Sequence, residues 1–187
     1  MVREQRLDRD SWSRAALEVL GERGVAGLAI EPLAKSLGTT KGSFYWHFRD
    51  REELISAALE RWENEETDAV IAMLGPLAGG RSRLRELITA IFVTHGEVPD
   101  RSIGLAAAAG HPAVEEVLER VTRRRIDYLA EELVAAGLGE GEARHRAVLA
   151  YTSYLGYSTL VRSTPGALPR GEQAAAFVDS MMRLLTS

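Results

Sequence analysis

The stretch that decides the fold reads TTKGSFYWHF, from Thr39 to Phe48. Phe44 and Phe48 are four residues apart and therefore fall on one face of a helix. At about 100° per residue, Tyr45 and Trp46 point away from that face. The pattern predicts a short helix that buries two phenylalanines and exposes two larger aromatic side chains beside a lysine. Such a surface is suited to contact a flat, anionic partner.

A second short helix is predicted just before this stretch, over Ile30 to Leu37. Pro32 is tolerated there because the amides of a first helical turn have no intrahelical partner. Gly38 ends the helix at the C′ position, and Thr40 caps the next one. Two short helices joined by a glycine turn, the second with an apolar anchor, are typical of a helix-turn-helix.

Residues 10–60 resemble the DNA-binding region of the tetracycline-repressor (TetR) family of bacterial transcription regulators. Leu33–Leu54 follows the family pattern L-A-x-x-L-G-x-x-K-G-x-F-Y-x-H-F and then an acidic E-E-L entry to a fourth helix. The sequence departs from the family at Ala29, where a Thr or Ser usually caps the second helix. This departure removes a cap worth about 1 kcal/mol and one expected phosphate contact.

Helical spacing of apolar residues continues nearly throughout, and no strand is predicted. We therefore expect an all-α protein of about nine helices, which is also the number that the family resemblance implies. It would have a three-helix helix-turn-helix head at residues 1–50 and a larger helical bundle for ligand binding and dimerisation at 51–187. The fourth helix begins with a capping-box pattern at Asp50 and Glu53. The expected helices cover residues 10–23, 30–37, 40–48, 50–74, 82–97, 102–109, 111–137, 140–162 and 171–187.

Composition narrows the possible functions. The 187 residues suffice for one or two domains, and the absence of cysteine excludes a disulfide scaffold and thiol chemistry and fits a reducing cytoplasm. Because no apolar run approaches 18 residues, we expect a cytoplasmic protein without a membrane span. The net charge of −4 is unevenly distributed, and both lysines of the chain, Lys35 and Lys41, fall in the helix-turn-helix. Local surface charge, rather than the net charge, decides contact with nucleic acid.

The exposed face of the predicted recognition helix is expected to bind a double-stranded DNA operator. A hydroxyl at a helix N-terminus suits a phosphate, and exposed aromatic side chains can pack on sugars or thymine methyl groups. The predicted DNA-binding residues, most of which the resemblance also implies, are Thr40, Lys41, Gly42, Ser43, Tyr45, Trp46, His47 and Arg51. As alternatives, Tyr45 and Trp46 would pack against the first helix, and His47 would be structural.

The C-terminal region is expected to form a homodimer, because a dimer doubles the contacts of a small head across an inverted repeat. The resemblance implies an interface on the last two helices, where small and apolar residues permit close packing. The expected interface residues are Ala147, Val148, Leu155, Gly156, Phe177, Val178, Met181 and Leu185.

A pocket for an unidentified small-molecule effector follows from the resemblance more than from any motif. Such pockets are typically lined by apolar side chains, with a few polar groups that orient the ligand. The candidates are Trp62, Phe92, His95, His111, Tyr128, Tyr151 and Tyr154. Each of them is also consistent with ordinary core or surface.

Two other classes of function were weighed. An enzyme is disfavoured because the chain has no H-E-x-x-H, G-x-S-x-G or Walker motif, and no cofactor is expected. No metal site is expected either, because His95 and Glu97 lack a third ligand. A protein that acts through a protein partner is disfavoured by the intact DNA-facing set. The sequence therefore predicts a homodimeric transcriptional repressor released by an effector, with an activator as the alternative.

Overall fold

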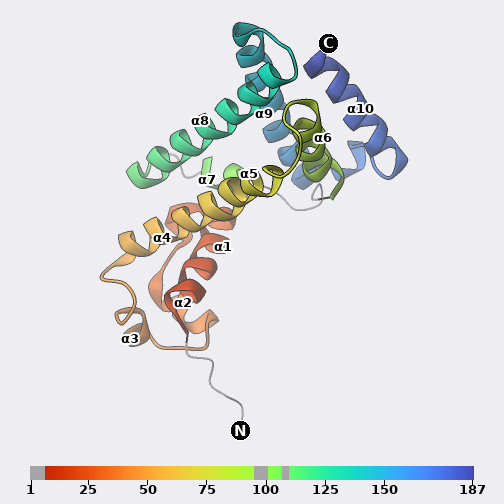
Figure 1. The fold of residues 1–187 in the computed structure, drawn as a ribbon. Helices are drawn as coiled ribbons and strands as arrows, with labels where there is room; N and C mark the ends of the chain where they lie inside the picture. The colour runs from red at the N-terminus through yellow and green to blue at the C-terminus, as the bar shows by residue number, and fades with distance from the viewer. Residues whose placement is uncertain (1–6, 95–100, 107–109) are drawn as a thin grey trace. The chain divides into compact units, whose positions relative to one another are not determined.

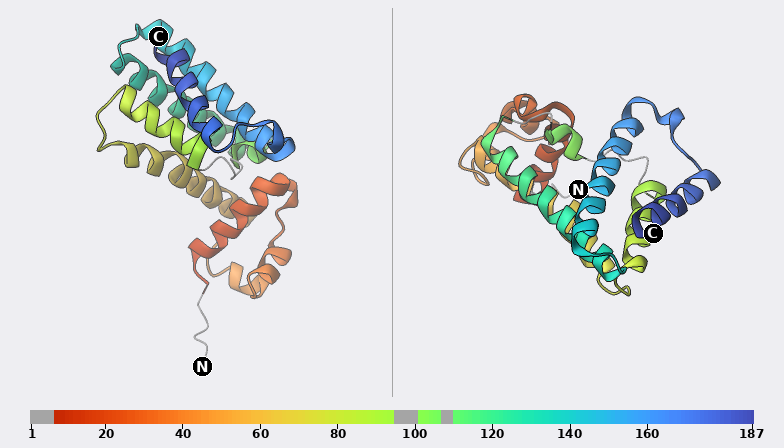
Figure 2. Two further views of the ribbon diagram at one scale, coloured as in Figure 1. Left: turned by 90° about the vertical axis from the view of Figure 1, so that its right-hand side faces the viewer. Right: turned by 90° about the horizontal axis from the view of Figure 1, so that it is seen from above.

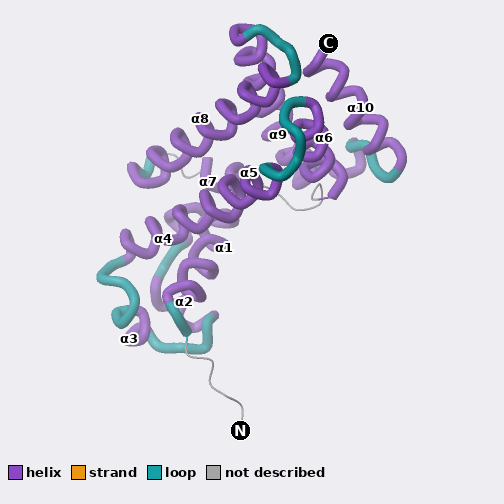
Figure 3. Tube along the Cα trace, viewed as in Figure 1, coloured by secondary structure: helices purple, strands orange, loops and turns teal. Residues whose placement is uncertain are grey.

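The computed structural model describes residues 7–94, 101–106 and 110–187, and every regular element in them is a helix (Figure 3). The predicted all-α class is confirmed. The chain forms two compact units, Met1–Glu66 with Gly104–Glu119, and Thr67–Ile103 with Arg120–Ser187. Among the described residues, no helix combines the length and apolar composition needed to cross a lipid bilayer.

The first unit is built on the packing of α1 against α4 (Figure 1). Its elements are α1 (Arg9–Gly27), α2 (Ile30–Ser36), α3 (Lys41–Phe44), α4 (Arg51–Glu63) and the parts of α7 (Arg101–Ala106) and α8 (Pro112–Ala135) within residues 104–119. The buried side chains recur at helical spacing on both helices and comprise Trp12, Ala16, Leu17, Leu20, Leu54, Ile55, Ala58, Leu59 and Trp62. Burial of each large apolar side chain contributes about 1.5–3 kcal/mol, so this pair of helices forms the scaffold of the head. The unit is larger than the predicted head because α4 and residues 104–119 pack with it.

Two glycines end helices of the head as predicted. Gly24, with φ 64°, breaks the helical run of α1 after Arg23. Gly38 follows α2 with φ 67°. Both conformations lie in the left-handed region, which glycine adopts without a steric penalty.

The second unit is a bundle in which α10 (Glu172–Thr186) packs against α6 (Arg81–Thr89) and the π-helical segment Ala90–Thr94 that continues α6 (Figure 2). It also contains α5 (Ala69–Leu74), residues 120–135 of α8, α9 (Glu140–Ser163) and a 3-10 turn at Pro165–Ala167. Its buried core comprises Leu84, Ile88, Phe92, Leu129, Leu133, Ala143, Ala147, Ala150, Tyr151, Val178, Met182 and Leu185.

Two of the predicted helices contain π-helical segments. α4 continues through Asn64–Asp68 into α5, which ends at Leu74, the predicted end of the fourth helix. Thr67 in this segment is buried, and its hydroxyl accepts a hydrogen bond from Nε of Arg125 at 2.9 Å. Counted as continuous helices, the described residues contain the predicted nine. A π turn adds one residue to a helix without ending it, so helix boundaries predicted from apolar spacing do not reveal it.

The helix α3 is shorter than predicted and ends at Phe44 instead of Phe48. The residues that follow form a turn in which the N–H groups of Trp46 and His47 donate to the carbonyls of Ser43 (3.3 Å) and Phe44 (2.9 Å). These i→i−3 bonds keep the turn nearly helical, so the faces assigned from the sequence are preserved.

Candidate nucleic-acid interface

The turn between α2 and α3 holds two short helices against each other (Figure 1). The N–H of Gly38 donates to the carbonyl of Lys35 at 3.1 Å, and the N–H of Thr39 donates to that of Ala34 at 2.9 Å. Leu33 and Ala34 are buried. The small side chain of Ala34 permits close packing at the turn, so the geometry is that of a helix-turn-helix.

Buried anchors and exposed aromatic side chains lie on opposite sides of α3 and the following turn. Phe44 is fully buried and lies edge-on to Trp12, with ring centroids 5.5 Å apart. It also stacks on Phe48 at 5.6 Å. Tyr45 is 58% exposed and Trp46 is 87% exposed, so the indole does not pack against α1. Two exposed aromatic side chains on a rigid core are a feature of binding surfaces rather than of ordinary protein surface.

The two lysines of the chain line one groove of α2 and α3. Lys35 on α2 and Lys41 at the start of α3 are exposed, and neither forms an ion pair in the described part of the chain. Arg14, by contrast, pairs with Asp10 at 2.9 Å. An open groove of α2 and α3 is lined by Glu31, Pro32, Ala34, Lys35, Gly38, Thr39, Thr40 and Lys41. This surface therefore presents two lysines that form no ion pair within the described residues, with Glu31 as the carboxylate of the same groove.

The hydroxyl of Thr40 caps α3, accepting a hydrogen bond from the N–H of Ser43 at 3.4 Å. Gly42 is exposed, and a Cβ atom at this position would have only the Thr40 hydroxyl within 4 Å, at 3.6 Å. The backbone of α3 is therefore open to close approach by a ligand.

Arg51, which belongs to the predicted DNA-binding set, directs its donors to groups of the protein itself. Its Nε donates to the carbonyl of Leu28 at 2.8 Å, and Nη2 donates to the carbonyl of Val25. A third contact joins Nη1 to Glu52 at 3.3 Å. These bonds satisfy carbonyls at the end of α1, so the guanidinium ties the α1–α2 connection to α4. The arginine that is most exposed nearby is Arg49, whose side chain is 85% exposed.

An ionic cluster joins the start of α1 to the turn after α3. Nη1 of Arg9 donates to the carbonyl of His47 at 2.6 Å and to the carboxylate of Glu53 at 2.9 Å. Its guanidinium carbon lies 4.3 Å from the centre of the Phe48 ring. Glu53 also accepts the backbone N–H of Arg49 at 2.8 Å and its Nε at 3.1 Å. We call Arg9, Glu53 and the groups that they bind the Arg9–Glu53 clamp.

The clamp holds the pKa of Glu53 far below its ordinary value of 4.5, at about 2. The causes, largest first, are the hydrogen bond from the backbone N–H of Arg49 and those from the side chains of Arg9 and Arg49. Glu53 is thus ionised at all physiological pH values. The sequence pattern had predicted that this glutamate would bind the N–H of the cap residue Asp50, but it binds that of the preceding residue instead.

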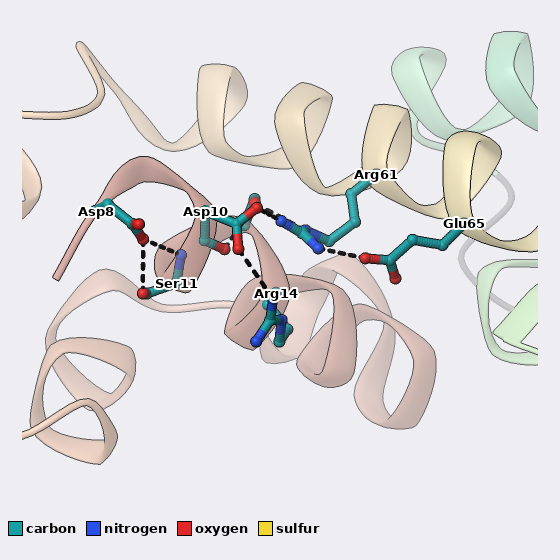
Figure 4. Close-up of polar contacts among 7 residues, drawn as sticks. Asp8, Asp10, Ser11, Arg14, Arg61 and Glu65 are labelled. Carbon is teal, nitrogen blue, oxygen red and sulfur yellow. Dashed lines mark hydrogen bonds and ion pairs between the residues drawn. The ribbon is translucent and has the colours of Figure 1, made fainter. Parts of the chain in front are cut away.

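Carboxylates also fix the N-terminus of α1 (Figure 4). Asp8 accepts hydrogen bonds from the N–H and the hydroxyl of Ser11 at 2.8 and 2.7 Å, and the pKa of Asp8 is lowered mainly by these two bonds. Asp10 pairs with Arg61 of α4, which also binds Glu65. The end of α1 that carries Arg9 is therefore held in place.

The missing cap of α2 has a structural reason. Asp8, Thr40 and Asp50 each accept the N–H of the residue three positions on, whereas Ala29 makes no side-chain cap. In α2 that third position is Pro32, which has no N–H. A serine or threonine at position 29 would therefore lack its most common partner, and the departure from the family costs less than the sequence alone suggested.

The predicted effector residues fall in different units. Trp62 and His111 belong to the first unit; the indole N–H of Trp62 donates to Glu66 at 3.0 Å, and Nε2 of His111 lies 3.0 Å from Glu52. Phe92 and Tyr151 lie in the core of the second unit, and Tyr154 packs against that core.

Tyr128, a further candidate, also belongs to the second unit, and burial raises the pKa of its hydroxyl. His95 lies outside the described residues. The structure thus brings Phe92, Tyr151 and Tyr154 together in one core, and the predicted pocket remains a prediction. No group of three or more His, Asp or Glu side chains in the described ranges is arranged to hold a metal ion.

The predicted interface residues differ in their exposure. Ala147, Val178 and Leu185 are buried in the core of the second unit, which leaves them no free surface for a partner. Leu155, Phe177 and Met181 are half-buried, whereas Val148 and Gly156 are exposed. The same two helices also carry the exposed apolar residues Leu149, Leu160 and Leu184, which the sequence prediction did not include. The two faces of α9 could not be told apart, because both carry small and apolar residues.

Sequence reasoning also missed Arg9, Lys35 and Arg49 as parts of the site. Lys35 could have been found, because it is one of only two lysines and lies in the helix-turn-helix. Arg9 is separated from Glu53 by 44 positions, and no local motif reports a contact of that kind.

Part of this chain is similar to known bacterial regulatory proteins. The family model for bacterial regulatory proteins of the tetR family matches residues 14–58. The tetracycline repressor protein class A from transposon 1721 of Escherichia coli is 47% identical over 47 residues, which are 25% of this chain and 22% of that protein. The match thus spans about a fifth of this curated relative.

Solved structures extend the likeness to the whole chain, as regards the fold. A TetR-family regulator from Rhodococcus sp. superposes with a TM-score of 0.68 and 24% identity over 96% of this chain and 98% of that one. AibR, solved with isovaleryl coenzyme A and operator DNA, superposes with a TM-score of 0.67. It is 17% identical in sequence, over 95% of this chain and 97% of that one.

Proposed function

We propose that this chain, whose residues 14–58 match the family model for bacterial regulatory proteins of the tetR family, is a sequence-specific transcriptional regulator that binds operator DNA. More specifically, we propose a homodimeric repressor that binds a palindromic operator. Binding of a small-molecule effector would release the repressor from the operator. The observation that carries it is the pair of exposed aromatic side chains, Tyr45 and Trp46, fixed over buried Phe44 beside the unpaired Lys41.

The surface contains groups for both kinds of contact that DNA recognition needs. Lys41, exposed at the start of α3, is suited to neutralise a phosphate, and Lys35 lies on the same groove. Tyr45 and Trp46 present apolar edges with one hydrogen-bond donor each, which suits thymine methyl groups and sugars. Gly42 adds no side chain that would keep the backbone away from the groove.

Exposed apolar side chains on α9 and α10 support the homodimer. Val148, Leu149, Leu160 and Leu184 are all large apolar side chains with substantial exposure. Gly156 on α9 permits close approach of a second helix. These residues, rather than buried Ala147, Val178 and Leu185, are the interface that we propose. Two heads joined in this way would bind the two halves of an inverted repeat.

Effector release requires that a ligand bind one conformation of the protein more tightly than another. AibR, which shares the fold, was solved with an acyl coenzyme A and operator DNA together, so this architecture accommodates both kinds of ligand. For this chain we propose a small molecule that binds the second unit, around the aromatic side chains of Phe92, Tyr151 and Tyr154.

The proposal is tested by the binding of Tyr45→Ala to a selected duplex and to a scrambled duplex of equal length. We expect Tyr45→Ala to weaken specific binding more than non-specific binding, because a base contact is lost only on the specific site. Met73→Ala, which changes an exposed apolar residue of α5 outside the proposed DNA-binding and dimer surfaces, is the matched control and should leave the ratio of the two affinities unchanged. An equal loss on both duplexes would show that Tyr45 reads no bases, and failure of the wild-type protein to bind any duplex would remove the proposed function.

A further inference from the structure

The aromatic side chains of the candidate interface lie in a segment that has little structure of its own. α3 contains four residues, and Trp46 and His47 follow it in a turn with i→i−3 hydrogen bonds of 3.3 and 2.9 Å. A helical segment this short is unstable alone, because the cost of nucleation exceeds what a few hydrogen bonds return. The position of Trp46 must therefore be fixed by contacts from outside the turn.

Burial of Phe44 and Phe48 supplies the apolar contacts that fix the turn. Arg9 supplies polar contacts to it. Nη1 of Arg9 donates to the carbonyl of His47 at 2.6 Å, which holds the residue next to Trp46. The guanidinium lies 4.3 Å from the centre of the Phe48 ring. A cation over an aromatic face at this distance is attracted by the ring. One side chain thus contacts two consecutive residues of the turn.

Glu53 holds Arg9 in that position and closes the other end of the turn. Its carboxylate accepts from Arg9 at 2.9 Å and from the backbone N–H of Arg49 at 2.8 Å. Asp50 caps α4 by accepting the N–H of Glu53 at 2.9 Å. The clamp therefore connects the first residue of α1, the turn after α3 and the first turn of α4.

We propose that Arg9 is a positioning residue for DNA recognition, which fixes the turn carrying Tyr45 and Trp46 through the carbonyl of His47 and the ring of Phe48. This inference rests on the proposed function. Arg9 acts through these two groups and not as a ligand of a phosphate, because its charge faces Glu53 at 2.9 Å. A turn that is fixed before binding loses less conformational entropy when it binds DNA. Removal of Arg9 would therefore lower the affinity for DNA without removing a contact to it.

The salt dependence of binding separates a positioning role from a direct phosphate contact. Each phosphate neutralised contributes about 0.9 to the slope of log K against log salt concentration. We expect Arg9→Ala to lower the affinity for a selected duplex about tenfold, on the order of the loss of one charge-assisted hydrogen bond, with no change in that slope. A slope lowered by about 0.9 per head would make Arg9 a phosphate ligand and would overturn the inference.

Arg9→Lys is the second variant, because it keeps the charge but lacks the planar group that contacts the carbonyl, the carboxylate and the ring together. We expect it to lose most of the affinity that Arg9→Ala loses. Full affinity in Arg9→Lys would show that charge alone matters. Arg14→Ala is the matched control: this arginine lies in the first turns of the same helix and pairs with Asp10 at 2.9 Å, and its removal should leave affinity and slope as in the wild type.

Hydrogen exchange of the free protein tests the positioning without DNA. The amide of His47, bonded to Phe44 at 2.9 Å, should lose at least tenfold protection in Arg9→Ala, while the amides of α1 and α4 keep theirs. Unchanged protection at His47 would refute the clamp whatever the DNA result. If protection falls as expected but even the wild-type protein binds no duplex, the proposed function fails and the positioning role in recognition fails with it. If the wild type binds and Arg9→Ala binds equally well, only the inference fails.

Discussion

Replacement of Lys41 by alanine should lower the salt dependence of DNA binding by the amount expected for one phosphate contact per head. Lys41 is exposed, lies at the first position of α3 and has no ion-pair partner in the described part of the chain. If it neutralises one phosphate in each head, the slope of log K against log salt falls by about 0.9 per head, hence by about 1.8 for a dimer on a full operator. The advantage of the wild type over Lys41→Ala would then shrink about 12-fold between about 50 and 200 mM salt.

The assay is fluorescence anisotropy of a labelled duplex titrated with wild type, Lys41→Ala and Arg14→Ala over a salt series. Because Lys41 is a surface residue, we expect its removal to change the free energy of unfolding by less than about 0.5 kcal/mol. Arg14→Ala removes the same charge from a side chain that Asp10 already neutralises, and its slope should equal that of the wild type. An unchanged slope in Lys41→Ala would remove this lysine from the phosphate contacts, and a change near 0.9 would argue against two heads on one site.

Three further predictions concern the head. Phe44→Ala should lower the free energy of unfolding, measured by chemical denaturation, by about 3–5 kcal/mol, because Phe44 is fully buried. Trp46→Ala should change that free energy by less than about 0.5 kcal/mol, because Trp46 is exposed, but it should weaken DNA binding. Glu53→Gln should lower the free energy of unfolding at neutral pH. The pKa of Glu53 is about 2 in the folded protein and 4.5 ordinarily, so the ionised carboxylate stabilises the fold fully above pH 4.5. The difference in stability between wild type and Glu53→Gln should therefore vanish as the pH falls from 4.5 toward 2. Ala29→Ser should raise the free energy of unfolding by less than about 0.5 kcal/mol, because a proline occupies the third position of α2; a gain of about 1 kcal/mol would contradict that explanation.

The parts of the fold that follow from local chemistry could be predicted from the sequence. Gly24 and Gly38 adopt the left-handed backbone expected at helix ends, and Thr40 and Asp50 cap the helices that they precede. The four-residue spacing of Phe44 and Phe48 placed both in the core and the intervening aromatic side chains outside. These predictions rest on residues that are close in sequence.

The parts of the site that depend on long-range contacts could not be predicted. Arg51 was expected to face DNA, but carbonyls at the end of α1, more than 20 residues earlier, take its donors. The role of Arg9 has no local signal either, because its partner Glu53 is 44 residues away. On α9, Ala147 and Val148 are adjacent and chemically similar, yet one is buried and the other exposed. The sequence alone contains no signal that distinguishes them.

The most direct test of the account is selection of bound sequences from a random pool of duplex DNA by the purified chain. We predict enrichment of an inverted repeat, because two identical heads joined through α9 and α10 would read two identical half-sites. Enrichment of a single half-site would support DNA recognition without the dimer. A folded protein that enriches no sequence would contradict the central claim that the face of Lys41, Tyr45 and Trp46 reads DNA.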